Sequence, residues 1–281
     1  MQWPTARRGY PFKRRQEARS TADFLPNDVC VSEDPTPQAA IDTLQGWVSI
    51  FPPQFEVLSP QGVAALFDDG RAHWAIEKLG GVHGLNVLEL GPLEGGHTYM
   101  LDRAGARSIT AIEGNKRCYL KCLVTKELFG VKSANVLLGN FVPWLEKNPQ
   151  RFDVIWATGV LYHMTEPVKL LKLLAERTDR LHIWTHFYPD EYAPKEPFDR
   201  PLVGIESRDY DGHAIPHFLR TYMGAENNAA YCGGVDSGSS WLRRSDILKV
   251  LERAGFSDIE VAFETPFTGN GPSFALVAQR R

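Results

Sequence analysis

The residues best suited to chemistry begin with a glycine-rich segment at 87–97, Val-Leu-Glu-Leu-Gly-Pro-Leu-Glu-Gly-Gly-His. An apolar run there includes Glu89, and glycines follow before a helical pattern starts. Glycine lets the backbone turn tightly and lets a ligand approach without a Cβ in its way, although many tight turns need glycine for structural reasons alone. We assign to this ligand-binding turn Glu89, Gly91, Pro92, Leu93, Gly95 and His97.

Three further segments place polar side chains after apolar runs. Glu113 and Gly114 follow Ile-Thr-Ala-Ile, and the carboxylate lies about 20 residues beyond the glycine turn, where it suits the hydroxyls of a ribose. Asn140 and Phe141 follow Leu-Leu-Gly and offer a polar side chain and a ring for an adenine. Thr158 follows Val-Ile-Trp-Ala. Because the carboxyl ends of parallel strands share one edge of a sheet, we expect these residues to bind one nucleoside-containing cofactor.

Apolar periodicity predicts the elements that must position these residues. Short apolar runs alternate with helical stretches, which indicates an α/β fold with a mostly parallel, Rossmann-like sheet covered on both faces. The expected strands span residues 85–90, 108–113, 134–138, 152–157 and 181–185, and a closing antiparallel pair spans 259–263 and 273–278. The expected helices span residues 37–47, 60–79, 97–104, 116–129, 143–147, 167–176 and 246–254, with Ser245 as the N-cap of the last.

The same pattern divides the chain into five parts. Residues 1–35 form an irregular basic arm, and 36–81 form an N-terminal helical extension. Residues 82–185 form the cofactor-binding core, and 241–281 complete that core. Residues 186–240 contain five prolines and scattered aromatic residues, and a stretch of that length inside a compact domain is typical of an inserted lid that covers a ligand.

From about residue 85 onward, the order of these segments resembles that of the class I S-adenosylmethionine-dependent methyltransferases. The resemblance implies their Rossmann-like fold, S-adenosylmethionine as the cofactor and methyl transfer as the reaction. Gly91 and Gly95 match the first and third glycines of that family's E/D-x-G-x-G-x-G turn, whereas Leu93 stands at the position of the second. With Pro92 beside Leu93, we expect a stiffer turn.

Within this class the sequence is most similar to the tRNA wobble-uridine carboxymethyltransferases and their small-molecule relatives. The matching segments are Gly-Val-Leu-Tyr-His at 159–163, His97, and Ser-Trp-Leu-Arg-Arg-Ser-Asp at 240–246. No arginine matches the one that this family places before its final helix, and the net charge of −3 argues against a tRNA partner. We therefore expect an oxygen or nitrogen of a small molecule, such as a sugar or secondary metabolite, as the methyl acceptor. A tRNA-modifying enzyme and a non-catalytic binding protein are the alternatives.

Methyl transfer is an in-line displacement that needs an aligned acceptor and, for a hydroxyl acceptor, a group that takes its proton. His163 is the first candidate for this base, with a histidine that only caps its loop as the alternative. His186, at the end of the fifth expected strand, is the second candidate. Tyr162 and His97 are expected near the amino-acid end of the cofactor.

Composition and cysteine spacing argue against a membrane-spanning, a secreted or a zinc-binding protein. A length of 281 residues with 43% hydrophobic and 23% charged content is typical of a globular chain. No stretch approaches the roughly 18–20 apolar residues that cross a bilayer, and the first residues lack the apolar core of a secretory signal. The four cysteines show no zinc or disulfide spacing, so we expect a cytoplasmic protein without a metal site, as a monomer or a homodimer.

Overall fold

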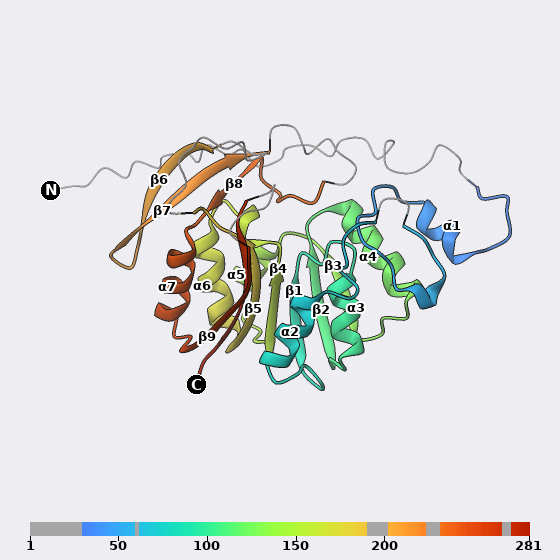
Figure 1. Ribbon diagram of the computed structural model, residues 1–281, viewed down its shortest axis with the longest axis horizontal. Coiled ribbons are helices and arrows are strands. Elements are labelled where there is room, and N and C mark those ends of the chain that lie inside the picture. The colour runs from blue at the N-terminus through green and yellow to red at the C-terminus, as the bar shows by residue number, and fades with distance from the viewer. Residues whose placement is uncertain (1–29, 60–61, 190–201, 223–230, 266–270) are drawn as a thin grey trace.

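The computed structural model describes residues 30–59, 62–189, 202–222, 231–265 and 271–281. Its centre is a seven-stranded sheet in the order β3-β2-β1-β4-β5-β10-β9 (Figure 1). Its strands are β1 (Asn86–Leu90), β2 (Ser108–Glu113), β3 (Ala134–Leu138), β4 (Val154–Thr158), β5 (Arg180–His186), β9 (Asp258–Thr265) and β10 (Ser273–Gln279). The strand order reverses between β1 and β4, which is the point where open α/β sheets bind ligands.

Strands β1 to β5 pair in parallel, and β10 pairs antiparallel with both β5 and β9. The connections between the parallel strands contain helices, as a parallel crossover requires. The α/β class, the mostly parallel sheet and the closing antiparallel pair that the sequence predicts are therefore confirmed.

Helices cover both faces of the sheet (Figure 1). They are α1 (Pro37–Asp42), α2 (Gly70–Lys78), α3 (Gly96–Arg103), α4 (Lys116–Leu128), α5 (Phe141–Lys147), α6 (Pro167–Arg177) and α7 (Arg244–Arg253), with short 3-10 turns η2 (Pro53–Phe55) and η3 (Leu161–His163). No helix in the described part of the chain is long and apolar enough to span a membrane.

Alternate residues of the central strands face two separate apolar cores. Val87 and Val154 share one core with buried residues of α1 to α4. Leu88 and Ile155 share the other core with buried residues of α5, α6 and α7. Because both faces of the sheet are covered, the strands appear in the sequence as continuous apolar runs and not as alternating ones.

The N-terminal extension is less helical than its apolar spacing predicts. The helix expected over 37–47 ends at Asp42. Residues 60 and 61 of the helix expected over 60–79 lie outside the described residues, and from residue 62 onward the helix begins only at Gly70, where the Asp69 side chain accepts the backbone N–H of Arg71 as an N-cap. The Ser245 N-cap is wrong as well, because α7 begins at Arg244.

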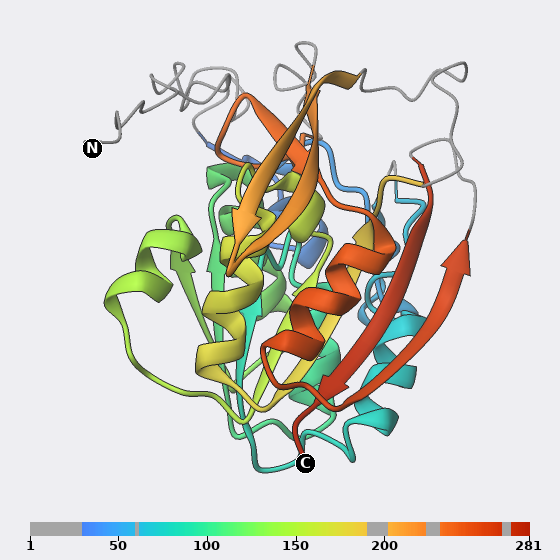
Figure 2. The same ribbon diagram turned by 90° about the vertical axis from the view of Figure 1, so that its left-hand side faces the viewer.

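The inserted segment contains regular structure where the sequence suggests none. It forms a three-stranded antiparallel sheet of β6 (Leu202–Tyr210), β7 (His213–Thr221) and β8 (Gly238–Trp241). Figure 2 shows the β6–β7 hairpin above helices α6 and α7. At its tip, Asp211 pairs with Lys172 of α6 and His213 contacts Arg253 of α7. The hairpin is therefore fastened to the core at its turn.

Arg280 joins the ends of two core helices. Its guanidinium donates hydrogen bonds to the backbone carbonyls of Ala175 in α6 and Ala254 after α7, each at 2.7 Å. It also pairs with Asp179 at 2.8 Å. Carbonyls at a helix C-terminus have no partner within the helix, so a single cation satisfies two helix ends here.

Replacing Arg280 by Ala is expected to lower the free energy of unfolding by about 2–3 kcal/mol, because several hydrogen bonds to one charged group are lost together. Urea denaturation measures the change. The control is Arg281→Ala: this neighbour is 78% exposed and pairs only with Asp258 at the surface, so its loss should cost below about 1 kcal/mol. Equal losses in the two variants would contradict the role of Arg280.

Candidate functional site

The glycine-rich segment forms the turn between β1 and α3. Gly91 has φ +62° and Gly95 has φ +81°, a conformation that favours glycine. A Cβ on Gly91 would lie 2.6 Å from a methyl group of Val160, so the strand-four loop packs directly on the turn. Leu93 also has a positive φ, +58°, although it bears a side chain. The turn therefore keeps the backbone path of a glycine loop without a glycine at its middle position.

Glu113 reaches this turn from the end of β2. Its Oε2 atom accepts the backbone N–H of Leu93 at 3.0 Å, and its Oε1 atom accepts the N–H of Asn115 at 2.8 Å. Asn115 in turn caps α4 by accepting the N–H of Arg117. The expected proximity of Glu113 to the glycine turn is thus present, and the carboxylate also fixes the start of α4.

Two carboxyl groups are buried at this edge. Burial raises the pKa of Glu113 to about 7, against the opposing effect of its hydrogen bonds from backbone N–H groups. Burial likewise raises the pKa of Glu89 to about 7, while the Thr98 hydroxyl donates to its Oε2 atom at 2.6 Å. Both groups therefore change charge near neutral pH.

His97 lies inside the protein, beneath the turn. Its Nδ1 atom accepts the indole N–H of Trp156 at 3.1 Å, which leaves the proton of a neutral ring on Nε2. Nε2 lies 2.9 Å from the Asp69 carboxylate. His97 and the arginine Arg71 hold the pKa of Asp69 well below its ordinary value, despite burial. Both ring nitrogens of His97 are thus bound to protein groups, and its expected cofactor contact stays a prediction.

The remaining predicted cofactor residues lie at the ends of β2, β3 and β4. The Asn140 side chain caps α5 by accepting the N–H of Val142, and Phe141 is buried beside it. The hydroxyl of Thr158 is buried without a hydrogen-bond partner in the described structure, which is unusual for a native protein. An unsatisfied polar atom at the strand edge is typical of a site that a ligand completes.

A segment of the insert, which we call the 231–236 strap, crosses the same edge. Its Tyr231 carbonyl accepts a hydrogen bond from the Asn115 side chain at 2.8 Å. A Cβ on Gly114 would lie 3.1 Å from a methyl group of Val235. A Cβ on Gly234 would lie 2.7 Å from the carbonyl oxygen of His163. The strap therefore links the end of β2, next to the predicted ribose position, to the strand-four loop.

The candidate catalytic residues meet in one aromatic cluster. The ring of Tyr162 lies 4.1 Å from that of His163 and 4.6 Å from that of His186, measured between centroids. His186 stacks on Trp241 of β8, with centroids 5.4 Å apart and the planes 6° from parallel. Trp184 of β5 lies 5.1 Å from His186. Residues from the strand-four loop, β5 and the inserted sheet thus form one wall.

Hydrogen bonds fix the tautomer of His186. Its Nδ1 atom lies 3.2 Å and 3.1 Å from the carbonyl oxygens of Gly271 and Pro272, so Nδ1 carries a proton and Nε2 is the acceptor of a neutral ring. His163 Nδ1 lies 2.9 Å from the hydroxyl of Tyr222, which also accepts the N–H of Gly234. A hydroxyl both donates and accepts, so this contact positions the His163 ring and assigns no tautomer to it.

Sequence reasoning missed Trp184 and Arg220. Trp184 could have been found, because its place two residues before His186 puts both side chains on one face of a strand. The buried Arg220, whose guanidinium lies 4.2 Å from the Trp241 ring centre, comes from a segment without a recognisable pattern. Tyr222 belongs to the scattered aromatic residues of the insert that the sequence already shows.

The acidic and histidine residues of the insert form no metal centre in the part of the chain that the structure describes. Asp211 pairs with Lys172, and burial lowers the pKa of His217, whose Nδ1 atom hydrogen-bonds the Ile215 carbonyl. Asp190 and Glu191, two further acidic residues of the insert, lie outside the described residues.

Comparison with known proteins gives structural relatives only. No family model and no curated protein sequence matches the chain. The N-terminal domain of EvdMO1, in a crystal structure with SAH and D-fucose, is 26% identical, covers 87% of this chain and 95% of that one, and superposes with a TM-score of 0.63. The fold is that of the class I methyltransferases. Open α/β sheets bind ligands beyond the carboxyl ends of their strands, which is where Glu113, Asn140 and Thr158 lie.

Two more structures extend the comparison. A crystal structure of EvdMO1 is 24% identical with a TM-score of 0.59, and the match covers 87% of this chain but 47% of that one. Magnesium protoporphyrin IX methyltransferase from Synechocystis PCC 6803, with bound SAM, is 18% identical with a TM-score of 0.46, over 75% of this chain and 76% of that one. The likeness to the SAH-bound EvdMO1 domain supports a methyltransferase enzyme with S-adenosylmethionine as cofactor. The comparisons leave the narrower resemblance to the tRNA-modifying family untested.

The raised pKa of Glu89 predicts how stability depends on pH. The folded protein holds this proton up to about pH 7, whereas the unfolded chain releases it near 4.5, so stability falls as the pH rises between these values. In Glu89→Gln, the loss of unfolding free energy between pH 5 and pH 8 should shrink by roughly 2–3 kcal/mol. The exposed Glu252→Gln variant should keep the wild-type dependence. Chemical denaturation at both pH values checks this, and an unchanged slope in Glu89→Gln would contradict it.

Proposed function

We propose that the protein transfers a methyl group from S-adenosylmethionine to an oxygen or nitrogen of a small molecule. The observation that carries the proposal is the junction of Glu113 with the Leu93 amide, which brings the acidic strand end to the glycine turn as the cofactor requires. The SAH-bound EvdMO1 domain, similar over 87% of this chain, supports the same cofactor.

The chain's own residues suit each part of the cofactor. Glu113 retains lone pairs for the two ribose hydroxyls while it holds the turn, since each carboxylate oxygen accepts more than one hydrogen bond. Asn140 and Phe141 flank the adenine position, and Gly91 allows close approach of the backbone. The buried Thr158 hydroxyl, which has no hydrogen-bond partner in the described part of the chain, would form a hydrogen bond with the cofactor. When bound, the cofactor supplies an activated methyl group on a sulfonium.

The aromatic cluster supports a role in acceptor binding and proton removal. His186 is the better base, because two backbone carbonyls hold the proton on Nδ1 and leave Nε2 basic. His163, which the Tyr222 hydroxyl holds at 2.9 Å, would orient the acceptor. The faces of Tyr162 and Trp184 suit the apolar face of a sugar ring, and D-fucose is present in the EvdMO1 crystal structure. A sugar hydroxyl is therefore the proposed acceptor.

Replacing Glu113 by Gln should weaken SAH binding about tenfold or more, because a hydrogen bond to a charged acceptor is lost. Wild-type affinity should fall about tenfold from pH 8 to pH 6, since the carboxyl group gains a proton near pH 7 and ceases to accept two hydrogen bonds. The variant should show little pH dependence. Calorimetric titration measures both, with the exposed Glu260→Gln as control. Wild-type affinity in Glu113→Gln would remove the ribose assignment.

Replacing His186 by Gln should lower kcat for a hydroxyl acceptor by about 10²- to 10⁴-fold and leave the SAH dissociation constant within about twofold. SAH release, followed over a panel of monosaccharides and glycosides, provides the assay. If His163→Gln loses kcat and His186→Gln does not, His163 is the base.

One measurement separates the proposal from its alternatives. Native mass spectrometry of the purified protein, with titration of S-adenosylmethionine and SAH, shows whether either compound binds. Absence of binding would leave a non-catalytic protein with this fold. Salt-sensitive tRNA binding that is lost on deletion of residues 1–20 would instead favour the tRNA-modifying alternative.

A further inference from the structure

The middle of the glycine turn is held in a conformation that its side chain disfavours. Leu93 has φ +58°, in the left-handed region where a Cβ crowds the following carbonyl oxygen. Such residues persist only where the surrounding structure determines their conformation. The contacts of Leu93 and of Glu94 beside it therefore show what maintains the turn.

The core supplies the first of these contacts. The Leu93 N–H donates to Glu113, and the Leu93 carbonyl accepts a hydrogen bond from the Cys122 thiol of α4 at 3.4 Å. The Thr125 hydroxyl of α4 donates to the Glu94 carbonyl at 2.7 Å. These bonds fix the backbone on the side of the turn that faces α4.

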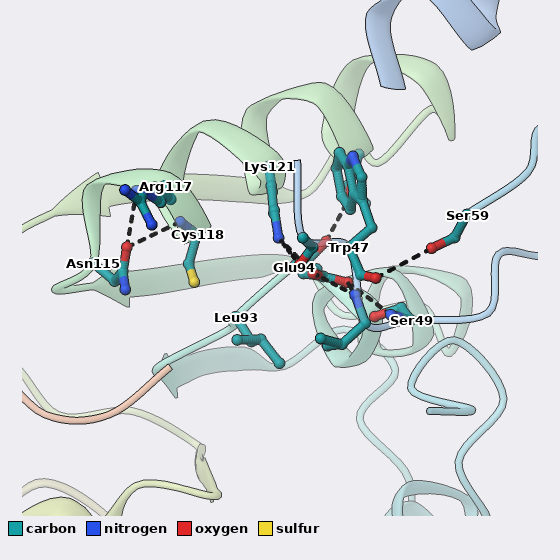
Figure 3. Close-up of polar contacts among 12 residues, drawn as sticks. Trp47, Ser49, Ser59, Leu93, Glu94, Asn115, Arg117, Cys118 and Lys121 are labelled. Atoms are coloured by element: carbon teal, nitrogen blue, oxygen red, sulfur yellow. Dashed lines mark hydrogen bonds and ion pairs between the residues drawn. The ribbon is translucent and has the colours of Figure 1, made fainter. Parts of the chain in front are cut away.

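The N-terminal extension supplies the rest through the Glu94 side chain. Glu94 is fully buried and pairs with Lys121 of α4 at 2.9 Å, and Lys121 also donates to the Gly46 carbonyl. The carboxylate accepts the backbone N–H groups of Val48 and Ser49, each at 2.9 Å. Figure 3 shows Glu94 between Lys121 on one side and Ser49 on the other. A buried ion pair of this kind is stable only when its remaining hydrogen-bonding capacity is satisfied, and the extension satisfies it here.

The extension also contacts the two positions that follow the turn. A Cβ on Gly96 would lie 2.6 Å from the carbonyl oxygen of Leu66, so the extension's backbone lies directly on the start of α3. The carboxylate of Asp69 binds His97 at 2.9 Å. Three closely spaced residues of the turn and helix start thus each contact a different part of the extension.

We infer that the N-terminal extension positions the cofactor turn. Through Val48 and Ser49 it holds the Glu94 carboxylate, and Glu94 with Lys121 holds Leu93 in the left-handed conformation that a glycine would adopt unaided. Glu94 is a positioning residue: it acts through the backbone of the turn and lies buried beneath it. The inference rests on the proposed cofactor site. It explains how a turn with Leu93 at its middle position keeps the backbone path of a glycine turn, since the extension supplies the contacts that hold it.

The test is Glu94→Gln, which keeps the shape of the side chain but turns an NH₂ group toward amide and ammonium donors. SAH should bind at least about tenfold more weakly, a factor that corresponds to ~1.4 kcal/mol. Val250→Ala, a buried change in α7 away from the turn, controls for general loss of stability. Lys121→Gln is the second variant if Glu94→Gln fails to fold.

A rescue variant distinguishes positioning from simple destabilisation. Glycine at position 93 adopts a positive φ without strain, so Leu93→Gly combined with Glu94→Gln should recover much of the lost SAH affinity. Its melting temperature should stay close to that of Glu94→Gln, because the buried amide remains mismatched. Recovery of stability and affinity in parallel, or no recovery of affinity, would overturn the inference.

Hydrogen exchange of the cofactor-free protein separates this inference from the proposed function. Amides of residues 91–96 should exchange about tenfold or more faster in Glu94→Gln than in the wild type, and Val250→Ala should leave them unchanged. Unchanged exchange overturns the inference even if SAH binds. If the wild type binds no SAH, the proposed function fails, and the role of the extension in positioning a cofactor turn fails with it, whatever the exchange shows.

Discussion

A buried carboxylate is costly unless its oxygens accept hydrogen bonds, and three of them meet around the turn between β1 and α3. Glu89 accepts a hydrogen bond from the Thr98 hydroxyl of α3. Glu113 accepts backbone N–H groups of the turn and of the N-cap of α4. Glu94 accepts backbone N–H groups of the extension and pairs with the Lys121 ammonium. Each requirement draws a different element to the same point. The hydrogen bonds of these three carboxylates therefore determine together the geometry of the proposed cofactor site.

Much of the core could be predicted from the sequence because its signals are local. The apolar runs of β2 and β3 match the observed strands residue for residue, and the distance from the glycine turn to Glu113 places both at one sheet edge. The helix expected from residue 60 onward was wrong for its first part, because a capping Asp69 outweighs apolar spacing. Strand β6 escaped prediction because charged residues interrupt its apolar alternation and much of it stays exposed.

The contacts of Glu94 could not be read from the sequence for a different reason. Its partners in the extension are backbone N–H groups 45 and 46 residues away, and a backbone donor leaves no residue type to recognise. The aromatic cluster of the candidate catalytic residues likewise depends on contacts that the sequence does not reveal. His163 and His186 stand out by type, but the residues that orient them, Tyr222 and Gly271 among others, gain meaning only from the fold. The side chains suited to chemistry could be identified from the sequence, whereas the residues and backbone groups that orient them could not.

The 231–236 strap contacts Gly114 and Asn115 through Val235 and Tyr231, and between these two positions its Gly234 packs on the His163 carbonyl. A displacement of the strap therefore changes the free energy of both sets of contacts, and such coupling acts equally in both directions. Substitutions in the insert that move the strap are expected to disturb the strand edge and the histidine loop together.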